Sequence, residues 1–490
     1  MPTIIVDGES YEGGPEDDTV LIWANDVVAD GGGGDDWLST RLFYEAAAGI
    51  SLSTRQIGGT GNDYLKAAMS LEGPPEDDDI PLSMSGTFDA GDGDDGIWAE
   101  FTSAYADQFV TVDAGDGDDR VTVSQPRFEQ WSFDNENHRS ESAVRAGDGD
   151  DVVSVFLWEG DFESLADAGT GAMSTVHGSD GADRITSEAH SSSGGGAENF
   201  LYGGDGKDEI KASASTGTYE GLAGPAYNRA RGGEGDDRIE MEATTSALGT
   251  LTNSATGDAG NDTISVYGMS WSASAQSDIS GGEGDDRLTA RIYVDNEFVG
   301  DYVYSAVNRV DGGAGEDRIT GIISTAFDQE TGDFFSELHG REGDDLIIAR
   351  GGFDNILAGN QGDDTLRGSG YSDRLIGGQG ADVLSGGEGE DEFVFMSPRG
   401  AASERDRILY FARGEDRIDI SAIDANAFRG GDQAFRFDGS SGTGRAWVEE
   451  DPESNGGLLY ADTGRGILVV AIHEAGNMDA SDYEARDFLL

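Results

Sequence analysis

Apolar residues recur along this chain in short alternating runs that are separated by glycine-rich segments. Runs such as Val121-Thr122-Val123 and Ile264-Ser265-Val266 direct every second side chain to one face. This alternation is typical of a β-strand with one buried and one exposed face. The sequence therefore predicts many short strands joined by glycine turns.

The glycine turns share a motif whose best example is Gly281-Gly282-Glu283-Gly284-Asp285-Asp286-Arg287-Leu288. Its sixth residue is aspartate, and its eighth residue is apolar. Another apolar residue usually lies two positions before the motif begins. Gln56 is a polar exception at that position, and we expect the neighbouring Ile57 to serve as the apolar residue instead. Copies begin at residues 31, 58, 90, 114, 146, 178, 203, 232, 257, 281, 312 and 340, and then at 359, 368, 377 and 386.

The spacing of these copies changes from long steps to steps of nine residues after residue 359. In the nine-residue region one apolar residue, such as Leu366, serves both apolar columns, whereas the long repeats insert about 19 residues between them. We expect the insertion to form a strand, a far-side bend and a returning strand. Each long repeat is then one coil, and equivalent turns stack along one edge.

The predicted fold is all-β, a parallel β-roll or β-helix solenoid with stacked turns, followed by a small β-rich C-terminal domain. A single coil cannot bury its own apolar face, so neighbouring coils must do so. We expect a first coil or cap at residues 1–30, long-rung repeats of about 28 residues at 31–347, nonapeptide repeats at 348–397, and a C-terminal cap at 398–490.

Charge makes this fold depend on cations. Acidic residues outnumber basic ones 97 to 31, the formal net charge is −66, and there are 76 glycines and no cysteine. Such a composition resembles a disordered chain, and its carboxylates oppose compaction. It argues against nucleic acid as a partner and, with no cysteine, against disulfides and thiolate metal sites. The apolar stretch at 467–472 is too short for membrane insertion.

The repeat resembles the RTX (repeats-in-toxin) calcium-binding nonapeptide, G-G-x-G-x-D-x-U-x, where U is apolar. Calcium takes six to eight oxygen ligands, and glycine turns can direct several carbonyls inward beside one aspartate. Two successive turns would complete the ligand shell. The pattern does not fit an EF-hand loop, and we interpret the second aspartate at position five, as in Asp94 and Asp118, as solvated charge.

The residues expected to bind several Ca²⁺ ions are the sixth-position aspartates and the second and fourth glycines of the clearest copies. They are Asp36, Asp63, Asp95, Asp119, Asp151, Asp183, Asp208, Asp237, Asp262, Asp286, Asp317, Asp345, Asp364, Asp373, Asp382 and Asp391, with Gly204, Gly206, Gly233, Gly235, Gly282, Gly284, Gly313, Gly315, Gly378, Gly380, Gly387 and Gly389.

The C-terminal segment resembles the region that follows the repeats in serralysin-type exoproteins, in the runs 406–411 and 414–421. The ending Asp487-Phe488-Leu489-Leu490 looks like the uncleaved signal of Gram-negative type I secretion. This resemblance implies a secreted or cell-surface protein that meets the type I secretion apparatus. We expect the repeats to stay largely unfolded in a calcium-poor cytosol and to fold outside the cell.

The sequence contains no recognisable catalytic motif, so we expect that the protein is not an enzyme. His473-Glu474-Ala475-Gly476-Asn477 lacks the second histidine of a zinc protease helix, and there is no G-x-S-x-G nucleophile elbow. Repeats begin by residue 31, which leaves no room before them for a catalytic domain.

The leading interpretation is a structural protein that self-associates into a surface layer, biofilm matrix or filament, because open ends of a roll leave strand edges unpaired. The alternative is a polysaccharide-binding or polysaccharide-modifying β-helix. Candidate residues for it are Asp134, Glu136 and His138, with Trp131, Trp158 and Trp271 for sugar stacking. Outward hydroxyls, such as Ser39 and Thr122, leave adhesion or ice binding as a third interpretation.

Overall fold

The structure is a computed structural model of the 490-residue chain. It describes residues 3–8, 10–45, 51–72, 82–103, 106–126, 139–159, 171–191, 195–217, 223–246, 249–271, 274–295, 305–326, 332–397, 405–428, 433–452, 456–473 and 480–490. Trp131, Asp134, Glu136, His138 and the run 474–477 lie outside the described residues.

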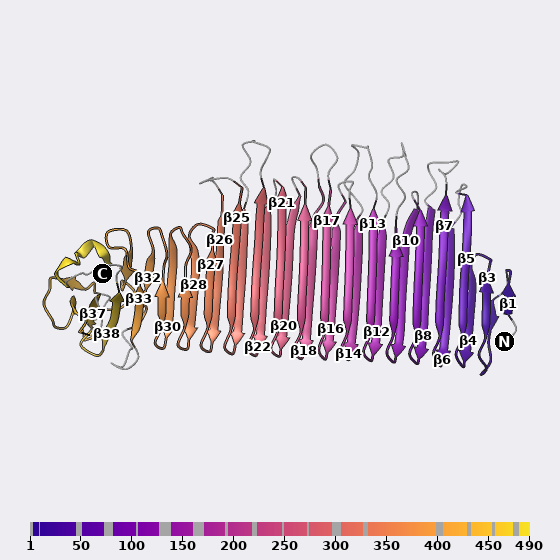
Figure 1. The fold of residues 1–490 in the computed structure, drawn as a ribbon, viewed down its shortest axis with the longest axis horizontal. Coiled ribbons are helices and arrows are strands. Elements are labelled where there is room, and N and C mark those ends of the chain that lie inside the picture. Colours follow the sequence, from indigo (N-terminus) through magenta and orange to yellow (C-terminus); the bar gives the residue numbers. More distant parts are fainter. Residues whose placement is uncertain are drawn as a thin grey trace. The chain divides into compact units, whose positions relative to one another are not determined.

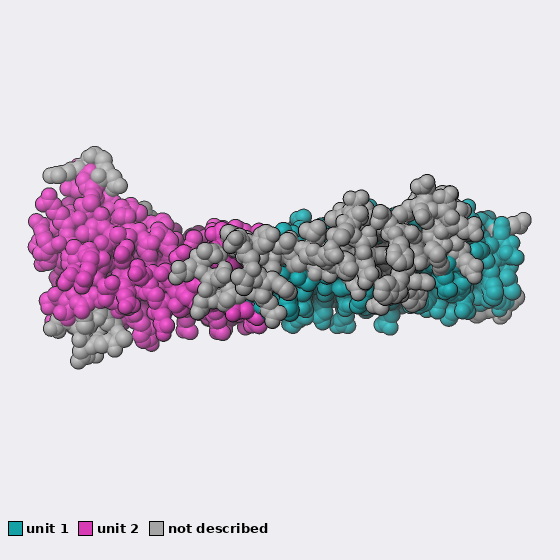
Figure 2. Space-filling model, turned by 90° about the horizontal axis from the view of Figure 1, so that it is seen from above, with its two compact units in different colours: residues 1–259, 265–275, 294–301 teal, residues 260–264, 276–293, 302–490 magenta. Residues whose placement is uncertain are grey.

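The chain divides into two compact units (Figure 2). Unit 1 comprises residues 1–259, 265–275 and 294–301, and unit 2 comprises 260–264, 276–293 and 302–490. In both units, successive strands alternate between two sheets, called sheet A and sheet B, and neighbouring coils pair in parallel (Figure 1).

The sheet A strands of unit 1 are β1 (Thr3–Val6), β3 (Thr19–Ile22), β5 (Trp37–Glu45), β7 (Tyr64–Glu72), β9 (Gly96–Ser103), β11 (Arg120–Gln125), β13 (Val152–Glu159), β15 (Arg184–Ser191), β17 (Glu209–Thr216) and β19 (Arg238–Thr245). Its sheet B strands are β2 (Tyr11–Glu12), β4 (Val27–Gly33), β6 (Ser51–Thr60), β8 (Leu82–Asp92), β10 (Ala106–Asp116), β12 (Ser140–Asp148), β14 (Ala172–Asp180), β16 (Ala197–Asp205), β18 (Ala226–Glu234) and β20 (Thr250–Ala259).

Three strands contain residues of both units: β21 (Thr263–Trp271), β22 (Ser274–Glu283) and β23 (Arg287–Asp295). Unit 2 continues with β25 (Arg318–Thr325), β27 (Leu346–Arg350), β29 (Thr365–Arg367), β31 (Val383–Ser385), β33 (Asp406–Leu409) and β35 (Arg436–Phe437) in sheet A. Its sheet B strands are β24 (Ala306–Ala314), β26 (Phe334–Glu342), β28 (Asn355–Gln361), β30 (Asp373–Gln379), β32 (Glu392–Val394), β34 (Arg417–Asp419) and β39 (Phe488–Leu489).

The core lies between the two sheets and is built from the two apolar columns of the repeat. Leu38 pairs in register with Leu65, Leu65 pairs with Ile97, and all three side chains are buried. The prediction for Gln56 is wrong: Gln56 itself is fully buried, and Ile57 points outward beside Asp89. The Gln56 amide can lie in the core because it donates to Thr40 Oγ1 (2.8 Å) and to the Lys66 carbonyl (2.7 Å).

The long and short repeats build coils differently. In a long repeat, one strand leaves the turn and another returns, as β9 and β10 do, which confirms the predicted insertion. A nonapeptide supplies only one strand, so β29, β30, β31 and β32 alternate between the sheets. The expectation of turns along one edge is therefore wrong for the nonapeptides, whose turns lie on both edges.

The C-terminal segment begins by continuing both sheets. β33 pairs in parallel with β31, and β34 pairs with β32. An antiparallel hairpin series then follows, with β36 (Arg445–Glu450), β37 (Gly456–Asp462) and β38 (Ile467–His473). After two short 3₁₀ helices, η1 (Ala480–Asp482) and η2 (Ala485–Asp487), β39 pairs with β34.

The architecture confirms the predicted all-β class and the parallel β-roll. Within the described residues, none of the helices has the length and apolar character needed to cross a membrane.

Candidate metal centre

The glycine turns depend on backbone conformations that side chains rarely adopt. Gly282 and Gly284 have φ values of +123° and +121°, and a β-carbon at Gly284 would lie 2.1 Å from the Gly260 carbonyl oxygen of the preceding turn. The same positive φ occurs at Gly204, Gly206, Gly233, Gly235, Gly313, Gly315, Gly378, Gly380, Gly387 and Gly389.

A glycine at the first position of the motif leaves a space that faces oxygen atoms. A β-carbon on Gly281 would lie 2.1 Å from Asp286 Oδ2 and 2.5 Å from the Gly312 carbonyl oxygen of the next turn. The corresponding distances at Gly203 are 2.1 Å to Asp208 Oδ2 and 2.6 Å to the Gly232 carbonyl oxygen. A carboxylate and a main-chain carbonyl from successive turns therefore converge beside the first position, which alanine occupies in the copies that begin at residues 90, 114 and 146.

The sixth-position aspartates form a ladder in each unit. One carboxylate oxygen, Oδ1, accepts the backbone N–H of the equivalent aspartate one turn earlier, as Asp286 Oδ1 does from Asp262 N (2.7 Å). In unit 1 the ladder runs through Asp18, Asp36, Asp63, Asp95, Asp119, Asp151, Asp183, Asp208 and Asp237. In unit 2 it runs through Asp262, Asp286, Asp317, Asp345, Asp364, Asp382 and Asp406.

The second oxygen, Oδ2, is buried without a hydrogen-bond partner at most of these positions. This holds for Asp36, Asp63, Asp95, Asp119, Asp151, Asp183, Asp208, Asp286, Asp317, Asp345, Asp364, Asp382 and Asp391. A buried charged oxygen without a partner is strongly unfavourable. The repetition of this arrangement fits a cation at each turn.

Burial also changes the acidity of these carboxyl groups. Desolvation, with a smaller contribution from neighbouring aspartates, raises the pKa of Asp286 to about 7 and that of Asp382 to about 8. Such carboxyl groups hold a proton near neutral pH unless a cation compensates their charge.

Each turn contributes one inner carboxylate. Among the residues that the structure describes, no three histidine, cysteine, aspartate or glutamate side chains gather as a metal cluster. A cation in these turns must therefore be completed by main-chain carbonyls, which suits an oxygen-binding ion such as Ca²⁺.

A second ladder occupies the opposite edge of the nonapeptide region. Asp373 N donates to Asp391 Oδ1 (3.0 Å), and Asp391 N donates to Asp416 Oδ1 (3.1 Å). These turns lead into sheet B strands, whereas Asp364 and Asp382 precede sheet A strands. Aspartates nine residues apart thus lie on different edges.

Two members of this second ladder are satisfied by the protein itself. Asp373 accepts from the Ser369 N–H and from Asn355 Nδ2 (2.6 Å), and Asp416 Oδ2 accepts from Ala412 N (2.7 Å). Their carboxylates fit a cation less well than that of Asp391.

Sequence reasoning missed three aspartates of these ladders, Asp18, Asp406 and Asp416. Asp18 belongs to a copy that begins at Gly13-Gly14 and has Val20 at the eighth position. Asp406 and Asp416 keep only the last part of the motif, Asp-Arg-Ile, without the leading glycines. That short remnant was the available signal.

The position-five residues form an outer, exposed ladder. Asp118 N donates to Asp94 Oδ1 (3.1 Å), and Asp150 N donates to Asp118 Oδ1 (2.9 Å). Asn62 and Asn261 occupy the same position. An amide serves here as well as a carboxylate, so this ladder braces adjacent turns through its carbonyl-type oxygen.

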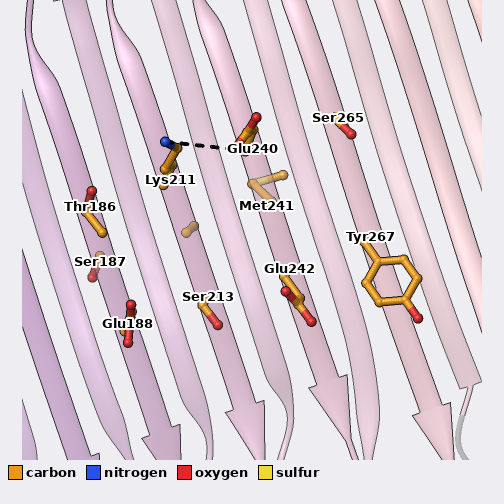
Figure 3. A pocket seen from close by; sticks show the side chains of 11 residues that line it. Thr186, Ser187, Glu188, Lys211, Ser213, Glu240, Met241, Glu242, Ser265 and Tyr267 are labelled. Carbon is orange, nitrogen blue, oxygen red and sulfur yellow. Dashed lines mark ion pairs between the residues drawn. The ribbon is translucent and has the colours of Figure 1, made fainter.

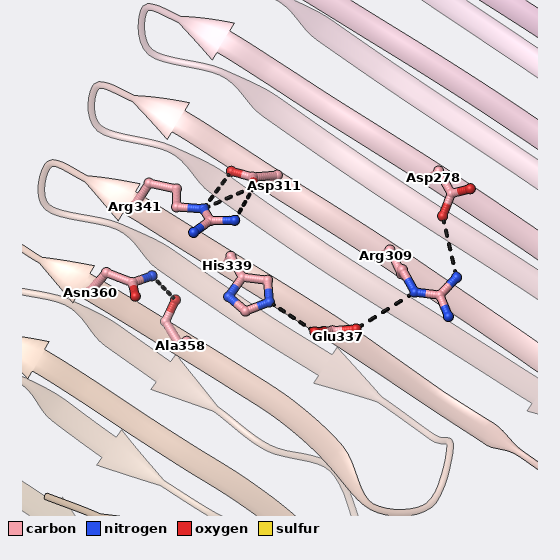
Figure 4. Close-up of polar contacts among 8 residues, drawn as sticks. All are labelled: Asp278, Arg309, Asp311, Glu337, His339, Arg341, Ala358 and Asn360. Atoms are coloured by element: carbon pink, nitrogen blue, oxygen red, sulfur yellow. Dashed lines mark hydrogen bonds and ion pairs between the residues drawn. The ribbon is translucent and has the colours of Figure 1, made fainter. Parts of the chain in front are cut away.

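Several basic side chains on the outer faces of the sheets form ion pairs. On sheet A of unit 1, Lys211 contacts Glu209 (2.6 Å), and it contacts Glu240 (4.0 Å) beside a shallow depression over Ser213 (Figure 3). On sheet B of unit 2, Arg309 lies 3.6 Å from both Asp278 and Glu337 (Figure 4).

Comparison with known proteins agrees with the turn geometry. The model of the RTX calcium-binding nonapeptide repeat (4 copies) matches residues 193–218, 304–321, 331–356 and 358–393. One solved structure that matches is the AlgE6R3 subunit of the Azotobacter vinelandii mannuronan C5-epimerase, with 26% identity, 34% of this chain and 83% of that chain covered, and a TM-score of 0.17. None of the curated proteins matches the chain.

Proposed function

Because the chain carries RTX calcium-binding nonapeptide repeats, we propose that it is a secreted structural protein whose β-roll folds outside the cell when its turns take up Ca²⁺. The repeats bind Ca²⁺ in several turns. The observation that carries the proposal is the row of buried Oδ2 atoms without partners.

The proposed ligands are the sixth-position aspartates and the carbonyl groups of the turn glycines. Bound Ca²⁺ supplies two positive charges to each group of oxygens. The Oδ1 ladder holds each carboxylate in place, and the glycines keep room for the ion. We leave Asp373 out of this set because both of its oxygens already accept hydrogen bonds.

The charge of the chain suits export before folding. At −66, an unliganded chain repels itself and stays extended in a calcium-poor cytosol. We propose passage through a type I secretion apparatus, guided by the C-terminal segment at 398–490, and folding at the higher calcium concentration outside. Residues 1–30, 31–347 and 348–397 would fold as first coil, long-rung repeats and nonapeptide repeats.

We propose that the folded protein self-associates into a surface layer, biofilm matrix or filament. Its parallel strands present main-chain groups that a second roll could pair with at the same spacing. Negative-stain electron microscopy with Ca²⁺ and with chelator tests this proposal. Ordered polymers only with Ca²⁺ support it, and monodisperse particles in millimolar Ca²⁺ contradict it.

Polysaccharide binding is the second candidate function. A group of exposed aromatic and basic side chains on sheet A of unit 1 favours this function.

A further inference from the structure

Three large aromatic side chains gather on the outward face of sheet A in unit 1. Trp37, Tyr64 and Trp98 come from the successive strands β5, β7 and β9. Trp37 is in register with Tyr64, and Trp98 is in register with Lys66. Trp37 is 48% exposed, although a tryptophan of a soluble domain is normally well covered.

Local contacts hold these rings in place. The ring centroids of Trp37 and Tyr64 are 4.5 Å apart. Tyr64 leans over the next strand, where a β-carbon at Gly96 would lie 2.8 Å from its ring. The Lys66 ammonium lies 4.0 Å from the centroid of Trp98. The rings thus form an ordered platform that crosses three strands.

Basic side chains lie beside this platform. Arg41, Lys66 and Arg120 point outward from β5, β7 and β11, with Glu100 in register beside them. The exposed acids of the outer ladder, Asp35, Asp94 and Asp118, precede β5, β9 and β11 at one end of the face. Within the described part of the chain, neither Arg41 nor Arg120 forms an ion pair. We call Trp37, Tyr64, Trp98, Arg41, Lys66 and Arg120 the aromatic face.

Lys211 lies in the same row of outward-facing residues as Lys66, but it pairs with acidic side chains. Register pairs connect Lys66 through Trp98, Thr122, Ser154 and Thr186 to Lys211. Lys211 is held by Glu209 and by Glu240 (Figure 3), whereas Lys66 lies against a ring. Lys66 thus has an aromatic contact in place of the two carboxylates that bind Lys211, and an external anion can pair with its ammonium.

We propose that the aromatic face binds a carboxylated polysaccharide. Ring faces stack against the C–H faces of sugar rings, and lysine and arginine bind their carboxylates. The platform crosses strands about 4.8 Å apart, so an extended polymer can contact several coils at once. A second copy of this chain is a poorer occupant, since protein interfaces need an apolar core and the face has few aliphatic side chains.

Isothermal titration calorimetry of the calcium-loaded full chain with hexagalacturonate tests the proposal, with neutral maltohexaose as the matched probe. Hexagalacturonate is expected to bind saturably and maltohexaose much more weakly. Trp98→Ala and Lys66→Glu should each lower the affinity about tenfold. The matched controls are Phe156→Ala, an exposed aromatic residue of β13, and Lys211→Gln, and each should change the affinity less than about twofold.

Three results would overturn the proposal: no saturable binding of hexagalacturonate, equal binding of maltohexaose, or unchanged affinity in Trp98→Ala and Lys66→Glu. If Lys66→Glu instead abolishes calcium-dependent self-association in sedimentation runs without sugar, the occupant is a second copy and the proposal is wrong. Circular dichroism in Ca²⁺ shows whether each protein is folded during these measurements. If the unsubstituted chain does not fold in Ca²⁺, the proposed calcium-dependent folding is contradicted, and not the sugar binding.

Discussion

At the scale of single residues, the two oxygens of one carboxylate have different roles. Asp286 Oδ1 accepts the Asp262 N–H at 2.7 Å, and Asp286 Oδ2 is buried without a partner. An amide could replace the first oxygen, as Asn62 and Asn261 do in the outer ladder. The charge of the second oxygen has no structural role unless a cation is present.

Asp286→Asn is therefore expected to change stability in opposite directions with and without Ca²⁺. With Ca²⁺ it should lower the free energy of unfolding by about 3 kcal/mol, because the ion loses a charged ligand. In chelator it should leave the β-sheet signal unchanged or raise it, because an unpaired buried charge is removed. Urea unfolding in Ca²⁺ and circular dichroism in chelator measure the two effects. Asp285→Asn is the matched control, and an equal loss in both variants would contradict the role of Oδ2.

Acid should stabilise the calcium-free roll. The pKa of Asp382 rises from an ordinary value of 3.8 to about 8 on folding, and that of Asp286 rises to about 7, mainly through burial. The folded state thus binds more protons, so its stabilisation is complete below about pH 4 and is lost as pH rises through 7 to 8. In chelator, the β-sheet signal in circular dichroism should therefore be stronger at pH 5 than at pH 8. A weaker signal at pH 5 would mean that these carboxyl groups are not buried as described.

At the scale of elements, the alternation of apolar residues and the position of the aspartates determine the strands and their register. Leu38, Leu65 and Ile97 could be aligned from the sequence, and they pair as expected. The sequence did not lead us to predict that the nonapeptide turns lie on two edges, because we did not consider that nine residues supply one strand and one turn. Two nonapeptides then complete one coil, so Asp373 and Asp382 belong to opposite edges.

The fourth glycine of the motif is expected to be essential for ion uptake. Gly284→Ala would place a β-carbon 2.1 Å from the Gly260 carbonyl oxygen, at a residue whose φ is +121°. It should remove at least one bound Ca²⁺ in calorimetry and cost about 2 kcal/mol or more in Ca²⁺. Gly370→Ala is the control, because nothing lies within 4 Å of its β-carbon position, and it should stay within about 0.5 kcal/mol of the unsubstituted protein. Equal calcium stoichiometry in Gly284→Ala would rule out this role of the turn.

Inside the roll, an asparagine ladder ties the sheets together, and the sequence did not reveal it. Asn199 Nδ2 donates to Asn228 Oδ1 (2.8 Å), and Asn228 Nδ2 donates to Asn253 Oδ1 (3.0 Å). Asn228 also donates to the Glu242 carbonyl across the core (2.7 Å). These residues lie 25–29 positions apart, so only the coil length brings them together.

Asn228→Ala should destabilise the calcium-loaded protein by about 2–3 kcal/mol, since it leaves the Glu242 carbonyl and Asn199 amide with unmade hydrogen bonds. Guanidinium unfolding in Ca²⁺ measures this loss. Ser254→Ala on the outer face should change stability by less than about 0.5 kcal/mol. Equal effects of the two substitutions would show that the asparagine ladder does not stabilise the protein.

At the scale of the whole molecule, the proposed uptake of Ca²⁺ would link charge to folding. Composition predicted a chain that opposes its own compaction, with 97 acidic residues against 31 basic ones. The structure places one acidic residue per turn where neighbouring turns can share an ion, and leaves the outer acids exposed. The aromatic face could not be predicted, because Trp37, Tyr64 and Trp98 come together only through strand register.

A calcium titration of the full chain, followed by far-ultraviolet circular dichroism and started in chelator, tests the central claim most directly. We expect a weak β-sheet signal without Ca²⁺ at neutral pH and a cooperative gain of this signal in millimolar Ca²⁺. Calorimetry should show that several ions bind per chain. A full β-sheet signal in chelator that does not change on adding Ca²⁺ would contradict it.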